Sequence, residues 1–332
     1  MAECAHCRVG AQGEVVRVSD AVLASWSDGA TKSAIVDFVD RCSGDGPDRV
    51  PVEERIAVFD NDGTLWTEKP MPTQLHFIVL QWAAAAAADP ELAQTEPYRS
   101  AATRDFTWLS NALDKHYAGD DSDLHIIIGA LLKLTAGMSV SDYEAAVEQF
   151  YRSAEHLTLG RPYSAVVYQP MVELLRYLED HGFTCYIVSG GDRDFMRPMT
   201  IANYGIPPER VVGSAVGLSY EDGEVRYSST FSFMDDGPEK PVRIWSRIGR
   251  RPILAVGNSN GDVPMLLYVQ KHPVSLSLLI HHDDDSGRGD LPYDKGAEGA
   301  LAEAHSNGIT VVSVKNDWNV VFPEPAALAD RP

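Results

Sequence analysis

The chain is poor in basic residues. Of its 332 residues, 28 are Lys or Arg and 48 are Asp or Glu, which gives a formal net charge of −20. Proteins that bind the phosphate backbone of nucleic acids present clustered Lys and Arg, so this balance argues against a nucleic-acid-binding protein. A small anionic ligand is compatible with the sequence, because one metal ion or one lysine can act on it locally.

Cysteine is scarce, and long apolar runs are missing. The four cysteines are Cys4, Cys7, Cys42 and Cys185. They suggest neither a disulfide framework nor a complete zinc site, since Cys4 and Cys7 lack a second ligand pair unless His6 or another subunit supplies it. No apolar segment has the length of a membrane span, and residues 1–20 lack the apolar stretch of a signal peptide. We therefore expect a cytoplasmic protein that does not bind membranes.

The most informative segment is an apolar run, residues 57–59, that ends in two carboxylates, Asp60 and Asp62, followed by Gly63. Such a run predicts a buried strand whose carboxyl end brings both aspartates to the edge of a sheet, where open α/β folds bind their ligands. A divalent cation would offset the repulsion between the carboxylates, so that one acts as nucleophile and the other as general acid and base. Taken alone, the four residues from Asp60 are also typical of a surface turn.

Two further predicted strands end in polar residues. Residues 183–188 lead into Ser189, Gly190 and Gly191, whose hydroxyl and backbone N–H groups can donate to phosphoryl oxygens. Residues 252–256 lead into a loop that contains Asn258 and Asp262, and such a loop can present oxygens to a hard cation. Each segment alone is also typical of an ordinary loop or turn.

The order and spacing of these segments resemble the motifs of the haloacid dehalogenase superfamily, in particular its aspartyl-phosphate phosphohydrolases. The resemblance implies that Asp60 is the nucleophile and that Asp62 is the general acid and base. It also implies that Ser189, the Gly190 amide and Lys240, which precedes the strand at 252–256, hold the phosphoryl oxygens.

The resemblance further implies a Mg²⁺ ion held by Asp60, the main-chain carbonyl of Asp62, and Asn258. The chain departs from the family pattern at Asn258, where an aspartate is usual, so the site loses one negative charge. Asp262 would act through water or orient Lys240. An acidic residue at the position of Glu68 binds the substrate ammonium in phosphoserine phosphatases, which the chain partly resembles; a helix-entry or surface acid is an equally good interpretation of Glu68.

The pattern of elements predicts an α/β fold with a Rossmann-like parallel sheet and an inserted α-helical cap. The core would comprise residues 1–66 and 165–332, with a helical extension over 1–54, and the cap would comprise residues 67–164. Helical periodicity in the cap covers 73–88, 99–118, 123–136 and 141–154, and caps of this kind exclude water and contact the substrate beyond its phosphate. We also expect a helix over 171–181, a last strand over 310–314, and a solvated loop over the charged run 281–285.

The predicted function is that of a Mg²⁺-dependent phosphomonoesterase, which hydrolyses a small phosphorylated metabolite through an aspartyl-phosphate intermediate. One alternative is a phosphotransferase or phosphomutase that uses the same intermediate. Another is a protein that binds a phosphorylated ligand without turnover, for which the substitution at Asn258 is the warning sign. A true dehalogenase needs neither the second carboxylate nor a metal, so Asp62 argues against that activity.

Overall fold

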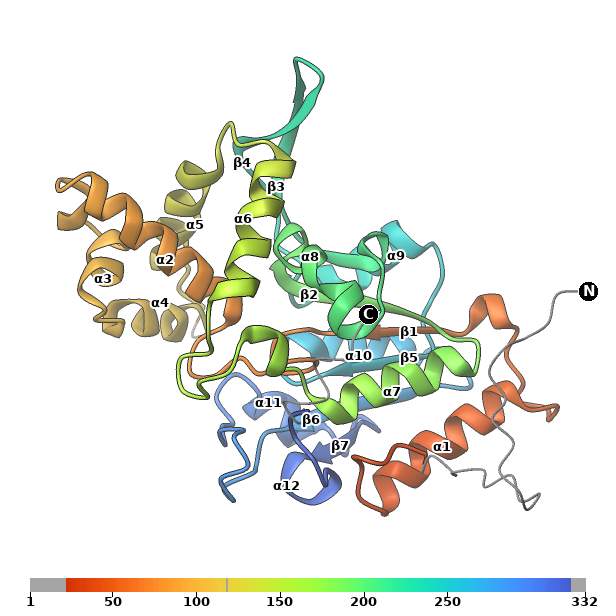
Figure 1. Ribbon diagram of the computed structural model, residues 1–332. Coiled ribbons are helices and arrows are strands. Elements are labelled where there is room, and N and C mark those ends of the chain that lie inside the picture. The colour runs from red at the N-terminus through yellow and green to blue at the C-terminus, as the bar shows by residue number, and fades with distance from the viewer. Residues whose placement is uncertain (1–21, 118, 324–332) are drawn as a thin grey trace, which may run out of the picture.

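A seven-stranded sheet forms the centre of the computed structural model, which describes residues 22–117 and 119–323. The strands lie in the order β4-β3-β2-β1-β5-β6-β7 (Figure 1). All neighbouring strands are parallel except β3 and β4, which form an antiparallel hairpin at one edge. Their bounds are β1 Ile56–Phe59, β2 Thr184–Asp192, β3 Val211–Glu221, β4 Glu224–Phe233, β5 Leu254–Gly257, β6 Leu276–His281 and β7 Thr310–Ser313.

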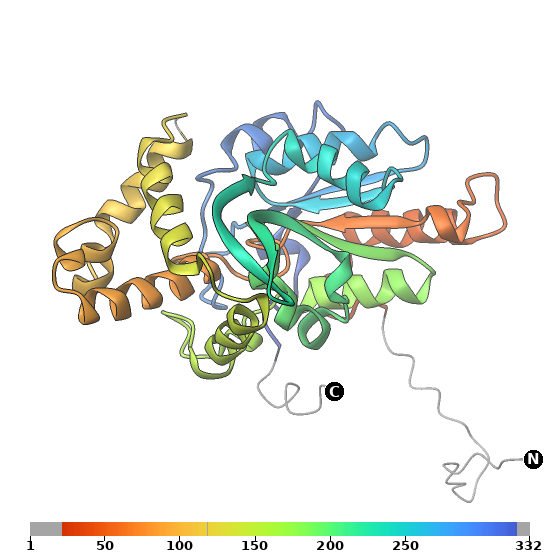
Figure 2. The same cartoon turned by 90° about the horizontal axis from the view of Figure 1, so that it is seen from above.

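Two apolar layers cover the two faces of the sheet. Side chains alternate along a strand, so Ala57 and Phe59 of β1 belong to one buried cluster while Val58 belongs to the other. The Val58 side is covered by α9 Glu239–Ile248, α10 Val263–Val269 and α11 Glu298–Glu303, and the opposite side by α1 Ala30–Ser43, α7 Gln169–Asp180 and α8 Arg193–Tyr204. Figure 2 shows helices on both sides of the sheet, and the predicted Rossmann-like α/β fold is confirmed.

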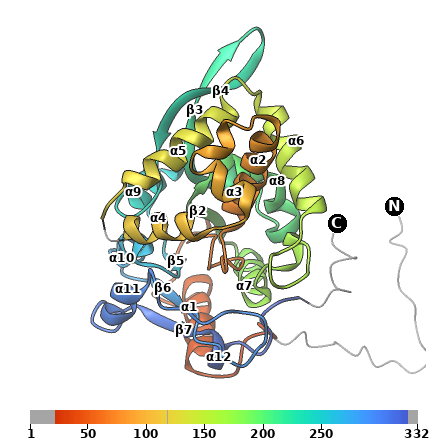
Figure 3. The ribbon, with the colours of Figure 1, turned by 90° about the vertical axis from the view of Figure 1, so that its left-hand side faces the viewer.

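A helical insertion lies between β1 and β2 and covers the carboxyl ends of the central strands (Figures 1 and 3). Its helices are α2 Thr73–Ala88, α3 Tyr98–Thr103, α4 Thr107–Tyr117, α5 Ser122–Thr135 and α6 Val140–Ser153. The helix expected over 99–118 is divided in two, because Arg104 adopts a left-handed conformation with φ 58°. The exact division of the chain into core and cap at residues 66 and 165 stays a prediction.

Other features of the structure differ from the sequence predictions or were not predicted. The β3–β4 hairpin, which extends from the sheet at the top of Figure 1, was not predicted from the sequence. The helix expected early in the chain begins at Ala30, and the Cys4–Cys7 pair lies outside the described residues. In the described part of the chain, no helix combines the length and apolar character needed to cross a bilayer. The cytoplasmic location stays a prediction.

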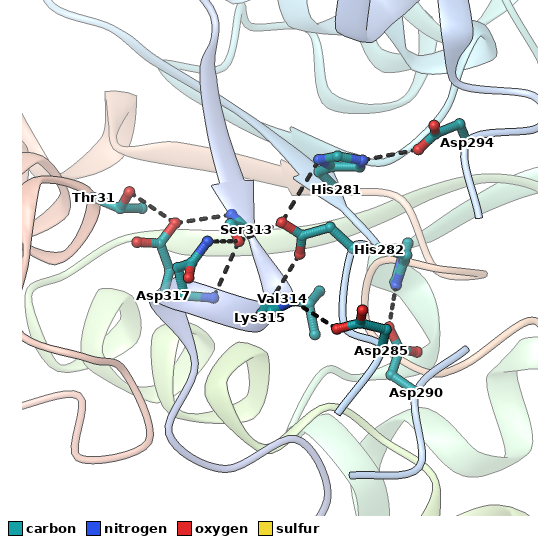
Figure 4. Close-up of polar contacts among 12 residues, drawn as sticks. Thr31, His281, His282, Asp285, Asp290, Asp294, Ser313, Val314, Lys315 and Asp317 are labelled. Atoms are coloured by element: carbon teal, nitrogen blue, oxygen red, sulfur yellow. Dashed lines mark hydrogen bonds and ion pairs between the residues drawn. The ribbon is translucent and has the colours of Figure 1, made fainter. Parts of the chain in front are cut away.

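The charged run at 281–285 is not the solvated loop that we expected. It begins at the last residue of β6, His281, and His282 and Asp284 are 2 % and 0 % exposed. Asp283 accepts from the Ser313 hydroxyl at 2.6 Å and Asp285 pairs with Lys315 at 2.6 Å, so the run is bonded to β7 and the helix after it (Figure 4). The composition of the run gave no sign of this burial, because charged residues are normally exposed and are buried only when each has a partner.

Candidate active site

Asp60 and Asp62 lie in the turn that follows β1, at the carboxyl edge of the sheet. The Asp60 amide donates to the Val256 carbonyl at 2.9 Å and so continues the pairing of β1 with β5 for one residue. Asp62 accepts from the Trp66 indole N–H at 2.8 Å through Oδ1. Gly63 has φ 73°, and a Cβ there would lie 2.1 Å from the Asn258 side-chain nitrogen, so the turn requires glycine.

A buried lysine joins two carboxylates beneath this turn. Lys240, in the first turn of α9, places its Nζ 2.8 Å from Asp60 Oδ1 and 2.5 Å from Asp262 Oδ1. Asp262 is itself fixed, because its Oδ2 accepts from the amides of Asn258 and Ser259 at 2.9 Å each. The three side chains are nearly inaccessible to solvent. The structure thus brings together three residues that the sequence places 180 and 22 positions apart.

Ser189 and Gly190 lie on β2, beside the Asp62 turn. The strand does not end at Ser189; it continues to Asp192 with an irregularity in its pairing with β3. A Cβ added at Gly191 would lie 3.5 Å from Asp62 Oδ2 and 3.5 Å from the Ser189 hydroxyl, which shows how closely these groups approach. The irregularity falls where this stretch of backbone approaches Asp62.

Asn258 and Glu68 lie on the other side of the turn. The Asn258 amide nitrogen donates to Glu68 and to the Tyr293 hydroxyl, both at 3.3 Å, and its oxygen accepts from the Thr64 hydroxyl at 3.3 Å. Glu68 also lies 3.5 Å from the Lys69 ammonium. The carboxylate predicted to bind a substrate ammonium therefore contacts groups of the protein itself, and that role stays a prediction.

Burial shifts the pKa values of the ionisable groups in the site. It raises the pKa of Asp62 to about 6, and the Glu68 carboxylate adds to the rise. Burial also raises the pKa of Asp60, and the Lys240 ammonium opposes that rise. For Lys240, burial disfavours the charge, but Asp262 and Asp60 outweigh it and raise the pKa. Lys240 is therefore a permanent cation at neutral pH.

A buried histidine, which was not predicted as a site residue, bonds to the turn that carries Asp62. His282 Nε2 lies 2.8 Å from the Gly63 carbonyl, and its Nδ1 lies 2.7 Å from Asp290. Asp290 also accepts from the Tyr168 hydroxyl at 2.8 Å, and the Tyr293 ring stacks on the imidazole at 4.6 Å. The signal was present, since His282 directly follows an apolar strand, as Asp60 does.

Asp235 and Asp236, which precede Lys240, were also missed. A Cβ at Gly261 would lie 2.2 Å from Asp236 Oδ1, so this carboxylate borders the same edge of the sheet. Asp235 is fully buried, and both of its carboxylate oxygens lack a hydrogen-bond partner. Burial raises the pKa of Asp235 to about 7, against the lowering effect of Lys240.

The residues that could hold a cation supply oxygen donors of the kind that Mg²⁺ prefers. Among the described residues, no group of three or more His, Cys, Asp or Glu side chains is arranged as a metal site. The predicted set differs from such a group, since it combines one carboxylate, Asp60, with a main-chain carbonyl of Asp62 and the amide oxygen of Asn258. The Glu68 carboxylate lies beside this set, 3.3 Å from the Asn258 amide nitrogen.

Comparisons with known proteins agree with this architecture. Residues 57–267 match the family described as haloacid dehalogenase-like hydrolase. A conserved protein of unknown function from Anaerococcus prevotii has a similar structure, with a TM-score of 0.51 and 16 % identity over 85 % of this chain and 91 % of that one.

Two other solved structures give lower scores. A protein of unknown function from Bordetella pertussis has a TM-score of 0.49 and 18 % identity, over 78 % of this chain and 98 % of that one. Cytosolic 5'-nucleotidase IIIB bound to cytidine has a TM-score of 0.49 and 15 % identity, over 90 % of this chain and 88 % of that one. No curated protein matches the sequence.

Proposed function

Because the chain belongs to the haloacid dehalogenase-like hydrolases, we propose that it hydrolyses a small phosphorylated metabolite, a phosphomonoester, through an intermediate on Asp60. The observation that carries the proposal is the buried Asp60–Lys240–Asp262 chain at the carboxyl edge of the sheet, with Asp62 two residues further along. A cation fixed beneath a carboxylate is the arrangement that a phosphate dianion needs when an anionic nucleophile attacks it.

The bonding of Asp60 supports its role as nucleophile. Its Oδ1 accepts from Lys240, which leaves Oδ2 to attack. In the first step Oδ2 bonds to phosphorus while the bond from phosphorus to the alcohol oxygen breaks. Lys240 offsets the repulsion between the carboxylate and the phosphate dianion, and the Ser189 hydroxyl and the Gly190 amide bind the remaining phosphoryl oxygens.

The environment of Asp62 supports its role as general acid and base. Its pKa near 6 leaves part of the population protonated at neutral pH, and Trp66 holds Oδ1 so that Oδ2 faces Gly191. Asp62 gives its proton to the leaving alcohol. It then takes a proton from the water that attacks the phosphorus of the Asp60 acyl phosphate, which releases phosphate, regenerates the Asp60 carboxylate and returns Asp62 to its protonated form.

The site also fits Mg²⁺ as a cofactor. Asp60, the Asp62 carbonyl and Asn258 would hold the ion, and Asp262 would orient Lys240. When bound, Mg²⁺ neutralises charge on the phosphoryl oxygens and offsets the repulsion between Asp60 and Asp62.

Phosphate release from a panel of phosphomonoesters, with Mg²⁺ or with EDTA, tests this function. We expect release that needs the metal and that Asp60→Asn abolishes. Asp45→Asn, at a side chain that is 99 % exposed, is the matched control and retains activity. Release that persists in Asp60→Asn contradicts the nucleophile, and phosphate transfer to an added alcohol in place of water indicates a phosphotransferase. Tight binding of phosphorylated ligands without release or transfer indicates a binding protein.

A further inference from the structure

A cavity of about 260 Å³ opens directly beside the proposed catalytic residues. Asp62, Gly190 and Gly191 line one end of it, and the helical insertion and the β3–β4 hairpin line the rest. It therefore lies where the part of a substrate beyond its phosphate would be placed. The residues that line the cavity therefore indicate the chemistry of that part of the substrate.

The wall from α5 is a stripe of aliphatic side chains. Leu124, Ile127, Ile128 and Leu131 follow the i, i+3, i+4, i+7 spacing of one helix face, and all four line the cavity. Leu124, Ile128 and Leu131 are only partly buried, so this face is not packed against another element over its whole area. An aliphatic helix face that lines a cavity and stays partly exposed is suited to an apolar ligand.

The other walls are also apolar. They are contributed by α2 through Leu75 and Ile78, by α4 through Leu113, and by the end of the hairpin through Phe231 and Met234. Among the lining residues in the described chain, none is Lys, Arg or His. A carboxylate or a second phosphate on the substrate would therefore find no cationic partner in the cavity.

Several polar groups at the edge of the cavity are bonded within the protein, and among them the Gln74 side-chain oxygen accepts from the Asp192 amide at 2.9 Å. The Ser214 hydroxyl donates to the Gly190 carbonyl at 2.7 Å and accepts from the Asp235 amide at 2.8 Å. The Asp192 carboxylate accepts from the Tyr143 hydroxyl at 3.2 Å and from the Asp194 amide at 3.0 Å. Apart from the Gln74 side-chain nitrogen and the Asp62 carboxylate, the lining offers little to replace the bonds to water that the hydroxyl groups of a sugar or glycerol substrate would lose.

From this lining we propose that the substrate is the phosphate ester of an apolar alcohol, an alkyl chain or ring that enters the cavity between α5 and the hairpin. The inference rests on the proposed phosphomonoesterase function and narrows its substrate class. A cavity of about 150 Å³ holds a benzene ring, so the present volume accommodates roughly six to ten carbon atoms. Glu68 does not line this cavity, which argues against an amino-acid ester as the substrate.

Two sets of esters test the substrate class. Propyl phosphate and glycerol 3-phosphate share a carbon skeleton and differ by two hydroxyl groups, and we expect kcat/KM to be at least about tenfold higher for the propyl ester. Across the series from propyl to octyl phosphate, kcat/KM rises about threefold to fourfold for each methylene until the cavity is filled. A flat series, or a preference for glycerol 3-phosphate or phosphoserine, overturns the inference while leaving the phosphatase function intact.

Variants of α5 localise the preference to the cavity. Ile128→Asn lowers kcat/KM for hexyl phosphate about tenfold or more and for methyl phosphate by a smaller factor. Ile128→Phe keeps the wall apolar and shifts the best substrate to a shorter chain, which serves as the test if the Asn variant does not fold. Ile126→Asn is the matched control, because Ile126 lies on the same helix, is 45 % exposed and does not line the cavity.

A binding measurement separates failure of this inference from failure of the proposed function. If no ester is hydrolysed, titration calorimetry with hexylphosphonate and methylphosphonate, which contain no hydrolysable ester bond, measures the cavity directly. Tighter binding of hexylphosphonate that Ile128→Asn removes supports an apolar site without turnover. Equal binding of the two, or none, overturns the inference.

Discussion

The two sides of the candidate site are built in opposite ways. On the sheet side, carboxylates and a lysine are buried and joined by hydrogen bonds of 2.5–2.8 Å that leave few alternative positions. On the insertion side, α5 presents aliphatic side chains that contact neighbours without directional bonds. A reaction requires catalytic atoms at fixed positions, whereas binding of an apolar group requires a large contact area. Substitutions should therefore cause large, all-or-none losses on the sheet side and graded changes on the insertion side.

Substitution of the buried lysine on the sheet side should cause the largest loss of activity. Lys240→Met leaves Asp60 and Asp262 without a cation, and we expect kcat/KM to fall by a factor on the order of 10³ or more. Stability should also fall by about 3–5 kcal/mol, because two buried carboxylates lose their partner. Steady-state kinetics and urea unfolding measure both effects. Arg243→Met, on the same helix, removes a half-buried cation and is the control; comparable losses there would contradict a special role for Lys240.

Removing the general acid causes the next largest loss. Asp62→Asn keeps the shape of the side chain but cannot transfer the proton, so we expect kcat to fall on the order of 10²–10³-fold for esters of alkyl alcohols. Esters of nitrophenol, whose leaving group needs no proton, should lose less in the first step. Burst kinetics with the two ester types separate the steps, and an equal loss for both esters in the first step would show that Asp62 is not the acid.

The pH dependence of stability probes the same side without any substrate. Asp235 has a pKa of about 7 in the folded protein and an ordinary value of 3.8, so the unfolded chain releases this proton first as pH rises. Its stabilising contribution is therefore complete below about pH 4, decreases up to about pH 7, and stays lost above that. Asp235→Asn should remove this decrease and raise stability at pH 8 by up to about 4 kcal/mol relative to the wild type.

Urea unfolding at pH 4, 6 and 8 checks this prediction. Part of the slope with pH should remain in the variant, because burial also raises the pKa of Asp192 to about 7 and that of Asp62 to about 6. Asp45→Asn, on the surface, should leave the whole curve unchanged. An Asp235→Asn curve that keeps the full wild-type slope would show that this carboxyl group titrates normally.

The smallest effect is expected where the insertion contacts the core. The Tyr143 hydroxyl, on α6, donates to Asp192 at 3.2 Å, and it is one of the directional bonds between the two sides. Tyr143→Phe should cost about 0.5–1.5 kcal/mol and leave the substrate preference in place. Thermal unfolding and the alkyl ester series measure the two quantities. A changed chain-length preference would show that the polar contact, as well as the aliphatic wall, determines specificity.

The sequence predicts the sheet side of the candidate site better than the insertion side. Apolar runs that end in Asp60, Ser189 and Asn258 locate three strands and the edge where they meet, because strand ends and short polar turns are local signals. The convergence of Lys240 on Asp60 came from a family resemblance, since a single lysine carries no pattern. The cavity was not predictable at all, because the spacing of Leu124, Ile127 and Leu131 is the same whether a helix face packs against a core or lines a cavity.

The β3–β4 hairpin and the His282 cluster were missed for different physical reasons. The hairpin is rich in Ser and Thr, and the apolar Leu218 and Tyr220 are exposed, so its apolar residues do not alternate with polar ones in step with burial. His282 was hidden in a run of charges whose buried partners, Asp290 and the Gly63 carbonyl, lie elsewhere in the chain. Long-range pairing of polar groups leaves little trace in the local sequence.

The hydrogen bond from His282 to the Gly63 carbonyl indicates how far the enzyme can be truncated at its C-terminal end. The family match ends at residue 267, so a fragment that stops there would contain every proposed catalytic residue but lose the imidazole that holds the Asp62 turn. Such a fragment would also lack β6 and β7, which complete one edge of the sheet. Expression boundaries, domain grafts and library fragments should therefore extend past Ser313, the last residue of β7, because the segment that identifies the family omits these supporting elements.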